Sequence, residues 1–123
     1  MSALAAYFLA VFVIGGVVGL VVAILEAPIM VAMSRSLGTQ RASWASLAFG
    51  ALTAAGIYAL GQQAFAWLGV HFAWYSYLAC MIAPVLNDGR RAGAEPADRW
   101  LEKMHATGML LGMVGSLVRH AIG

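Results

Sequence analysis

Two long stretches of this chain carry no charged side chain, and they constrain the fold more than any other feature. Residues 1–25 and residues 42–87 contain no Asp, Glu, Lys or Arg. The hydrocarbon core of a bilayer is about 30 Å thick, so a helix that crosses it needs about 20 apolar residues. The first stretch is long enough for one such helix and the second for two. The sequence therefore predicts an all-α integral membrane protein.

The composition agrees with a membrane protein and not with a soluble domain. Hydrophobic residues make up 63% of the 123 residues, charged residues make up 10%, and the mean hydropathy is +0.85. Soluble domains usually contain about 25% charged residues. The first apolar stretch lacks the positive region of a secretory signal, so we interpret it as a retained span. The single cysteine, Cys80, excludes an internal disulfide and a thiolate-cluster metal site.

Polar and turn-forming residues divide the chain into four predicted helices. We predict one domain, a compact bundle of four transmembrane helices over residues 1–123, with spans at about 5–33, 43–64, 67–87 and 100–120. The turn between the second and third helices should fall within Gly61–His71. Gly38 is a natural stop for the first helix, Asn87-Asp88-Gly89 has the chemistry of a turn, and Pro96 suits the first turn of the last helix.

The last helix is the least certain span by length. It is free of charge only from Met104 to Val118, which is short for a crossing unless Lys103 and Arg119 extend to the two interfaces. An alternative therefore stays open, with three spans and a C-terminal amphipathic helix that lies in the interface.

The basic residues predict the orientation, because cytoplasmic loops are enriched in Lys and Arg. The loop between the second and third helices has no basic residue, and Arg119 is the one exception to the pattern. Loops one and three should therefore face the cytoplasm, with both termini outside it, in a multi-pass protein of a bacterial inner membrane. The residues that support this orientation are Arg35, Arg41, Arg90, Arg91, Arg99 and Lys103.

Glu26 is the first charged residue of the chain and the strongest functional candidate. In a span over 5–33 it would lie about 9 Å from the midpoint, since the rise is about 1.5 Å per residue. A carboxylate at that depth is costly unless it faces the bundle, has a partner or is protonated. Pro28 cannot donate to the Ile24 carbonyl, which leaves an acceptor near the acid. We predict a proton-coupling site at Glu26 and Pro28. The alternative is that the span ends at Leu25 and Glu26 marks the headgroup boundary.

Two weaker patterns lie in the last helix. Glu102 and His105 form a Glu-x-x-His pair, which occurs in carboxylate-bridged di-metal bundles and could combine with Glu26 in a homodimer. His105, Met109 and Met113 lie on one stripe and offer donors that suit copper or haem. The ordinary interpretations are an ion pair of Glu102 with a nearby basic residue and methionines that fill space between helices. We therefore predict no metal and no cofactor.

Small residues repeat every four positions along three of the predicted helices. Such stripes let helix backbones approach closely. Packing within one chain would explain some of them, but three stripes exceed what one small bundle needs. We therefore expect assembly with copies of the chain or with other membrane subunits. The stripes are Gly15, Gly19 and Ala23 in the first helix, Ser46, Gly50 and Ala54 in the second, and Gly108, Gly112 and Ser116 in the last.

The pattern as a whole favours transport over catalysis. Nucleophilic triads, phosphate-binding loops and zinc-ligand spacings are absent, and the loops are too short to hold a catalytic domain. We expect no enzyme and no nucleic-acid partner. The first hypothesis is a small oligomeric transporter or channel for an ion or small solute, surrounded by membrane lipid and proton-coupled through Glu26. The alternatives are a non-catalytic accessory or scaffold subunit of a larger membrane complex and a phage-type holin.

Overall fold

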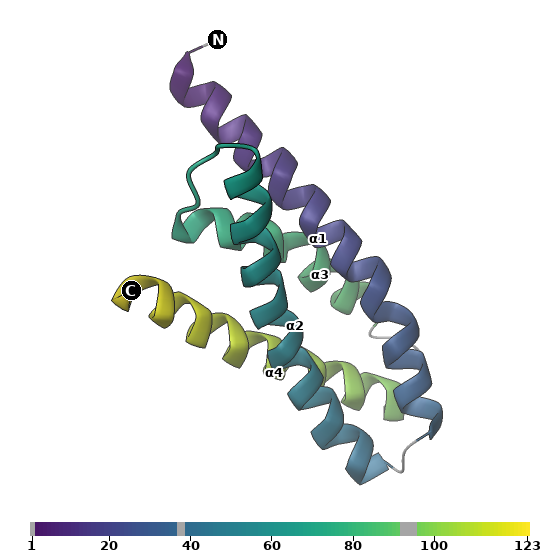
Figure 1. The fold of residues 1–123 in the computed structure, drawn as a ribbon. Helices are drawn as coiled ribbons and strands as arrows, with labels where there is room; N and C mark the ends of the chain where they lie inside the picture. The colour runs from purple at the N-terminus through teal and green to yellow at the C-terminus, as the bar shows by residue number, and fades with distance from the viewer. Residues whose placement is uncertain (1, 37–38, 92–95) are drawn as a thin grey trace.

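The protein is all-helical, as the sequence predicts. The computed structural model describes residues 2–36, 39–91 and 96–123, and the regular structure in these ranges is α-helix (Figure 1). The helices are α1 (Ala3–Ser36), α2 (Thr39–Trp67), α3 (Trp74–Arg91) and α4 (Pro96–Ile122). The last helix begins at Pro96, where the absence of a backbone N–H costs nothing.

Two of the described helices are long and apolar enough to cross a membrane, namely α1 over Ala3–Met30 and α2 over Ser43–Trp67. Only 22% and 28% of these two segments are buried inside the molecule. The core helix of a soluble protein is mostly buried, so this low burial favours an apolar environment around both helices. Large side chains such as Phe12, Val17 and Leu52 are accordingly exposed.

Helix α1 packs against α3, and the two run in the same direction. Near the start of both helices the Tyr75 hydroxyl donates to the Tyr7 hydroxyl over 3.0 Å. Toward the end of both helices the Asn87 amide lies 3.5 Å from the Ala23 carbonyl oxygen, to which it donates. Residues near the two starts are in contact, and so are residues near the two ends, so the helices are parallel.

Helix α2 packs against α4 in the same parallel sense, and these two share the most extensive contact in the molecule. The Trp100 indole N–H donates to the Ser43 hydroxyl over 2.7 Å near the start of both helices. The Tyr58 hydroxyl and the His120 Nδ1 are 2.7 Å apart near their ends. In Figure 1, α4 crosses α2 obliquely. The chain thus forms two parallel helix pairs, and consecutive helices run in opposite directions.

The turn between α2 and α3 occupies residues 68–73 and overlaps the interval predicted for it. Gly69 has a φ of 69°, in the left-handed region that glycine adopts without a steric cost. The Val70 N–H donates to the Phe65 carbonyl and the Gly69 N–H to the Ala66 carbonyl, which together form a Schellman motif. This motif ends α2 at Trp67, so residues 68–73 are not part of the third helix.

The turn predicted at Asn87-Asp88-Gly89 is wrong, because α3 continues through these residues to Arg91. Turn-forming residues are only a weak preference, and tertiary contacts override it. Asn87 makes such a contact with α1. The stop predicted at Gly38 lies outside the described residues, as do the side chains of Arg35, Arg41, Arg90, Arg91 and Arg99 that support the orientation.

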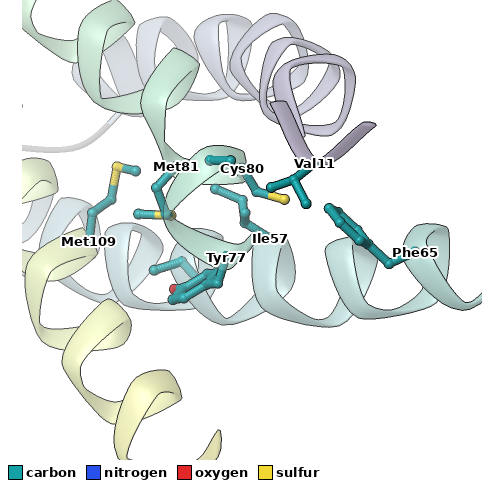
Figure 2. Close-up of a cluster of buried hydrophobic side chains, with 9 residues drawn as sticks. Val11, Ile57, Phe65, Tyr77, Cys80, Met81 and Met109 are labelled. Atoms are coloured by element: carbon teal, nitrogen blue, oxygen red, sulfur yellow. The ribbon is translucent and has the colours of Figure 1, made fainter. Parts of the chain in front are cut away.

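The apolar core draws on all four helices. Val11 of α1, Ile57 and Phe65 of α2, Tyr77 of α3 and Met109 of α4 are all fully or almost fully buried in one cluster (Figure 2). Tyr77 is the largest of the fully buried side chains, and its hydroxyl donates to the Ala54 carbonyl over 2.9 Å. This bond satisfies a polar group that would otherwise be costly to bury.

Candidate functional site

Glu26 lies on the inward face of α1. The residues of α1 that are buried recur every three or four positions, and Ala23, Glu26 and Met30 continue that series while Ile24 and Leu25 are exposed. The Glu26 side chain is only 2% exposed. A carboxyl group at this position therefore faces the other helices and not the surroundings of the molecule.

His105 of α4 is the partner that the structure shows for Glu26. The His105 Nε2 lies 3.4 Å from the Glu26 Oε2, and the two side chains are 0% and 2% exposed. The imidazole is also stacked at a tilt on Phe49 of α2, with ring centroids 5.5 Å apart. The pair thus joins the first and last helices in an environment that excludes solvent.

Polar side chains from all four helices gather at this end of the molecule. We call Glu26, Ser43, Ser46, Asn87 and His105 the inner polar layer. Both serines are buried. Trp100 and Asn87 each form a hydrogen bond that links two helices, to Ser43 and to the Ala23 carbonyl respectively. The layer thus contains at least one side chain from each of the four helices.

Glu102 lies one turn before His105 on α4, and its Oε2 is shielded from solvent. The structure therefore places the Glu-x-x-His motif beside the buried pair. Among the described residues, no three His, Cys, Asp or Glu side chains are grouped closely enough to hold a metal ion. The donor set that would be needed for a di-metal centre is not assembled within the described part of one chain.

The two methionines of the predicted soft-donor stripe belong to the core. Met109 is 2% exposed and is part of the hydrophobic cluster, and Met113 packs against that cluster. Pro28 lies inside α1, which continues past it to Ser36. A proline within a helix removes one hydrogen bond, here to the Ile24 carbonyl, two residues before Glu26.

The small residues predicted for assembly are used inside the chain. A Cβ placed at Gly15 would lie 2.8 Å from the Ala79 Cβ, and one at Gly19 would lie 3.1 Å from the Pro84 ring, both on α3. A Cβ placed at Gly112 would lie 2.6 Å from the Ala51 carbonyl oxygen of α2. These stripes therefore form the contacts between α1 and α3 and between α2 and α4, so they are no evidence for an oligomer.

The other α4 positions of the stripe face α2 and α3 in the same way. A Cβ placed at Gly108 would collide with the Leu47 carbonyl of α2. Ser116 is 9% exposed and lies close to Tyr77 of α3. The backbones of α2 and α4 can approach this closely only because Gly108 has no side chain.

A pocket at the opposite end of the molecule was not predicted from the sequence. It has a volume of about 650 Å³ and lies between the C-terminal parts of α2 and α4. Its polar lining residues are Tyr58, Gln62, Ser116, Arg119 and His120. The only signal in the sequence is that Gln62, Arg119 and His120 are polar residues near the ends of apolar helices. Their meeting depends on the parallel packing of α2 with α4.

Comparisons of this chain with protein-family models, with curated proteins and with solved structures find no match.

Proposed function

We propose that this chain is an integral membrane protein in which Glu26 and His105 bind and release a proton that is coupled to the movement of an ion or small solute. The observation that supports the proposal is the pair itself, which joins α1 to α4 over 3.4 Å at 2% exposure or less. Ionisable residues within apolar helices are rare because they are costly, and they mark ion and proton pathways in many membrane proteins.

The chemistry of the pair suits proton exchange. A carboxyl group and an imidazole that share one proton are neutral in total, whichever group holds it, and a second proton leaves one net positive charge. Among the described residues, Glu102 is the other titratable group near the pair on α4, while α2 contributes Ser46 and α3 contributes Asn87.

Stability alone does not account for such a pair. Buried ion pairs lose most of their Coulomb energy to desolvation, and apolar residues of similar size often stabilise a fold at least as well. The inner polar layer therefore has a cost in folding free energy that an apolar core would not have. A role in proton binding that alters the contact between α1 and α4 would explain why the chain has these polar residues despite their cost in folding free energy.

The proposal includes four spans. If α1 and α2 cross the bilayer, α3 runs in the same sense as α1, and α4 runs in the same sense as α2 although it crosses α2 obliquely. The segments that carry Arg35, Arg41 and Arg90 then face the cytoplasm, and both termini lie outside it in a bacterial inner membrane. Because the chain is small and its core is filled, the pathway would run between protomers of a homo-oligomer.

Proton flux into liposomes tests the proposal. The full chain is reconstituted with a pH-sensitive dye inside, and a pH gradient is imposed in the presence of candidate cations and small solutes. Glu26→Gln keeps the size of the side chain but cannot titrate, so it should abolish solute-dependent proton flux. His105→Gln should have the same effect. Glu95→Gln makes the same chemical change in the polar stretch before α4 and should retain the flux.

Two outcomes would contradict the proposal. One is flux in Glu26→Gln equal to that of the unchanged chain. The other is an absence of flux together with loss of fixed co-purifying membrane proteins in Glu26→Gln, which would favour the accessory-subunit hypothesis. Folding is checked separately, by helical content and by the elution volume in detergent, so that a misfolded variant is not counted as an inactive one.

A further inference from the structure

The pocket between α2 and α4 lies far from the Glu26–His105 pair, and we propose that it binds a phosphate-bearing anion, either a phospholipid headgroup or free phosphate. Its volume of about 650 Å³ is within the range of about 300–1,000 Å³ that is typical of small-molecule sites. The proposal does not depend on proton transport and concerns a different set of residues.

Charge is the first reason to expect an anion. Arg119 lines the pocket, and none of the described residues that line it is Asp or Glu. The adjoining stretches 42–87 and 104–118 contain no Asp, Glu, Lys or Arg. The planar guanidinium group of arginine presents paired N–H donors that match the oxygens of a phosphate. Arg119 therefore provides both a charge and a geometry that favour this ligand.

The Tyr58–His120 pair supplies a further donor. The Tyr58 hydroxyl and the His120 Nδ1 lie 2.7 Å apart, and Tyr58 is held by edge-to-face contacts with Phe72 and Tyr77. A tyrosine and a neutral imidazole carry two polar hydrogens between them, and their mutual bond uses one. Whichever tautomer is present, one donor remains available. Both residues line the pocket.

The shape of the surface favours the headgroup of a lipid. Arg119 lies in the last turn of α4, and Gln62 lies one turn before the last turn of α2, so both would be near the headgroups if these helices cross a bilayer. Below them the pocket wall is apolar at Ala55 and Ala59, and Leu52, one turn earlier on α2, is 70% exposed. A polar recess beside exposed apolar side chains is the surface that a phospholipid would complement.

Native mass spectrometry of the full chain in a non-ionic detergent tests this inference, with phosphatidylglycerol and phosphate-free diacylglycerol as lipid probes. Isothermal titration calorimetry with inorganic phosphate tests the soluble source. Arg119→Gln should weaken binding of the phosphate-bearing probe by about tenfold or more, since a charge-assisted contact is lost. Lys103→Gln removes one positive charge from an exposed position at the other end of α4 and should leave binding unchanged, as should Glu26→Gln.

Each outcome either supports or overturns the inference. Retention of phosphatidylglycerol over diacylglycerol that depends on Arg119 identifies a lipid headgroup site. Binding of inorganic phosphate alone, again dependent on Arg119, identifies free phosphate as the ligand. Equal retention of the two lipids without phosphate binding, or equal weakening by Arg119→Gln and Lys103→Gln, would mean that the pocket does not recognise phosphate.

Discussion

Glu26 and His105 are two buried ionisable side chains that lie in contact. Each lies on the inward face of its helix, and neither is more than 2% exposed. In such an environment electrostatic interactions are stronger than in water, and the two groups are energetically coupled. We therefore expect the contact between α1 and α4 to depend on both side chains.

A double-mutant cycle measures this coupling directly. We expect Glu26→Gln and His105→Gln each to change the free energy of unfolding in detergent. The double variant should differ from the sum of the two by about 0.5–3 kcal/mol, as is usual for residues in contact. The control cycle pairs Glu26→Gln with Thr107→Val, at an exposed position of α4. That cycle should be additive within about 0.5 kcal/mol. Additivity in both cycles would show that the 3.4 Å contact has no energetic weight.

The candidate residues of the buried pair could be named from the sequence, but their pairing could not. Glu26 stands out because it interrupts an apolar stretch, and His105 because it follows Glu102 by three positions. The sequence spacing places each residue on a face of its own helix. It does not say which helices face each other, and residues 79 positions apart meet only through the parallel arrangement of the helix pairs.

Helix contacts in this molecule are made at positions where no side chain intervenes. The stripe of small residues on α4 meets α2, and the stripe on α1 meets α3. The stripes were apparent from a repeat of four in the sequence. Their use within the chain was not, because a small residue permits a close approach without identifying the partner. The expectation of an oligomer assumed that some of these small residues contact another chain.

The contact between α2 and α4 should tolerate no Cβ at Gly108. A methyl group there would collide with the Leu47 carbonyl and lie 3.1 Å from the Ala51 nitrogen, so the helices would have to separate. We expect Gly108→Ala to lower the free energy of unfolding by about 1–3 kcal/mol, as is typical of overpacking. Gly115→Ala is the matched control on the same helix, because no atom lies within 4 Å of its added Cβ. It should be neutral or stabilise by about 0.5–1 kcal/mol.

The contact between α1 and α3 offers an even closer comparison, since Gly15 and Gly16 are adjacent. A Cβ at Gly15 would lie 3.1 Å from the backbone nitrogen of Cys80, whereas one at Gly16 would meet nothing within 4 Å. The Cys80 side chain is fully buried. Gly15→Ala should therefore increase the rate at which a maleimide labels Cys80 in detergent, and Gly16→Ala should leave it unchanged. Equal rates in the two variants would mean that the contact is looser than the structure shows.

At the scale of the whole molecule, α1 and α3 run in one direction, and α2 and α4 run in the other. Consecutive helices alternate in direction, so the turn at 68–73 and the end of α4 lie on one side of the bundle. The end of α3 and the start of α4 lie on the other side. The sequence leaves open whether α4 crosses the bilayer or lies in the interface, because its charge-free stretch is short. Its contacts with α2, from Ser43–Trp100 to Tyr58–His120, now give it a direction relative to α2.

Cysteine labelling in sealed membranes tests whether this arrangement crosses a bilayer. Cys80 is first replaced by Ser, and single cysteines are introduced at Leu68, Gly93 and Ile122; Leu68 and Ile122 are 64% and 82% exposed. We expect an impermeant maleimide to label Leu68→Cys and Ile122→Cys from the same side. Gly93→Cys should react only from the other side, which the basic residues identify as the cytoplasm. The parallel packing of α4 with α2 requires this result if α2 is a span. Labelling of Ile122→Cys and Gly93→Cys from the same side, with Leu68→Cys on the opposite one, would show that α4 lies in the interface and that its packing on α2 differs in the membrane.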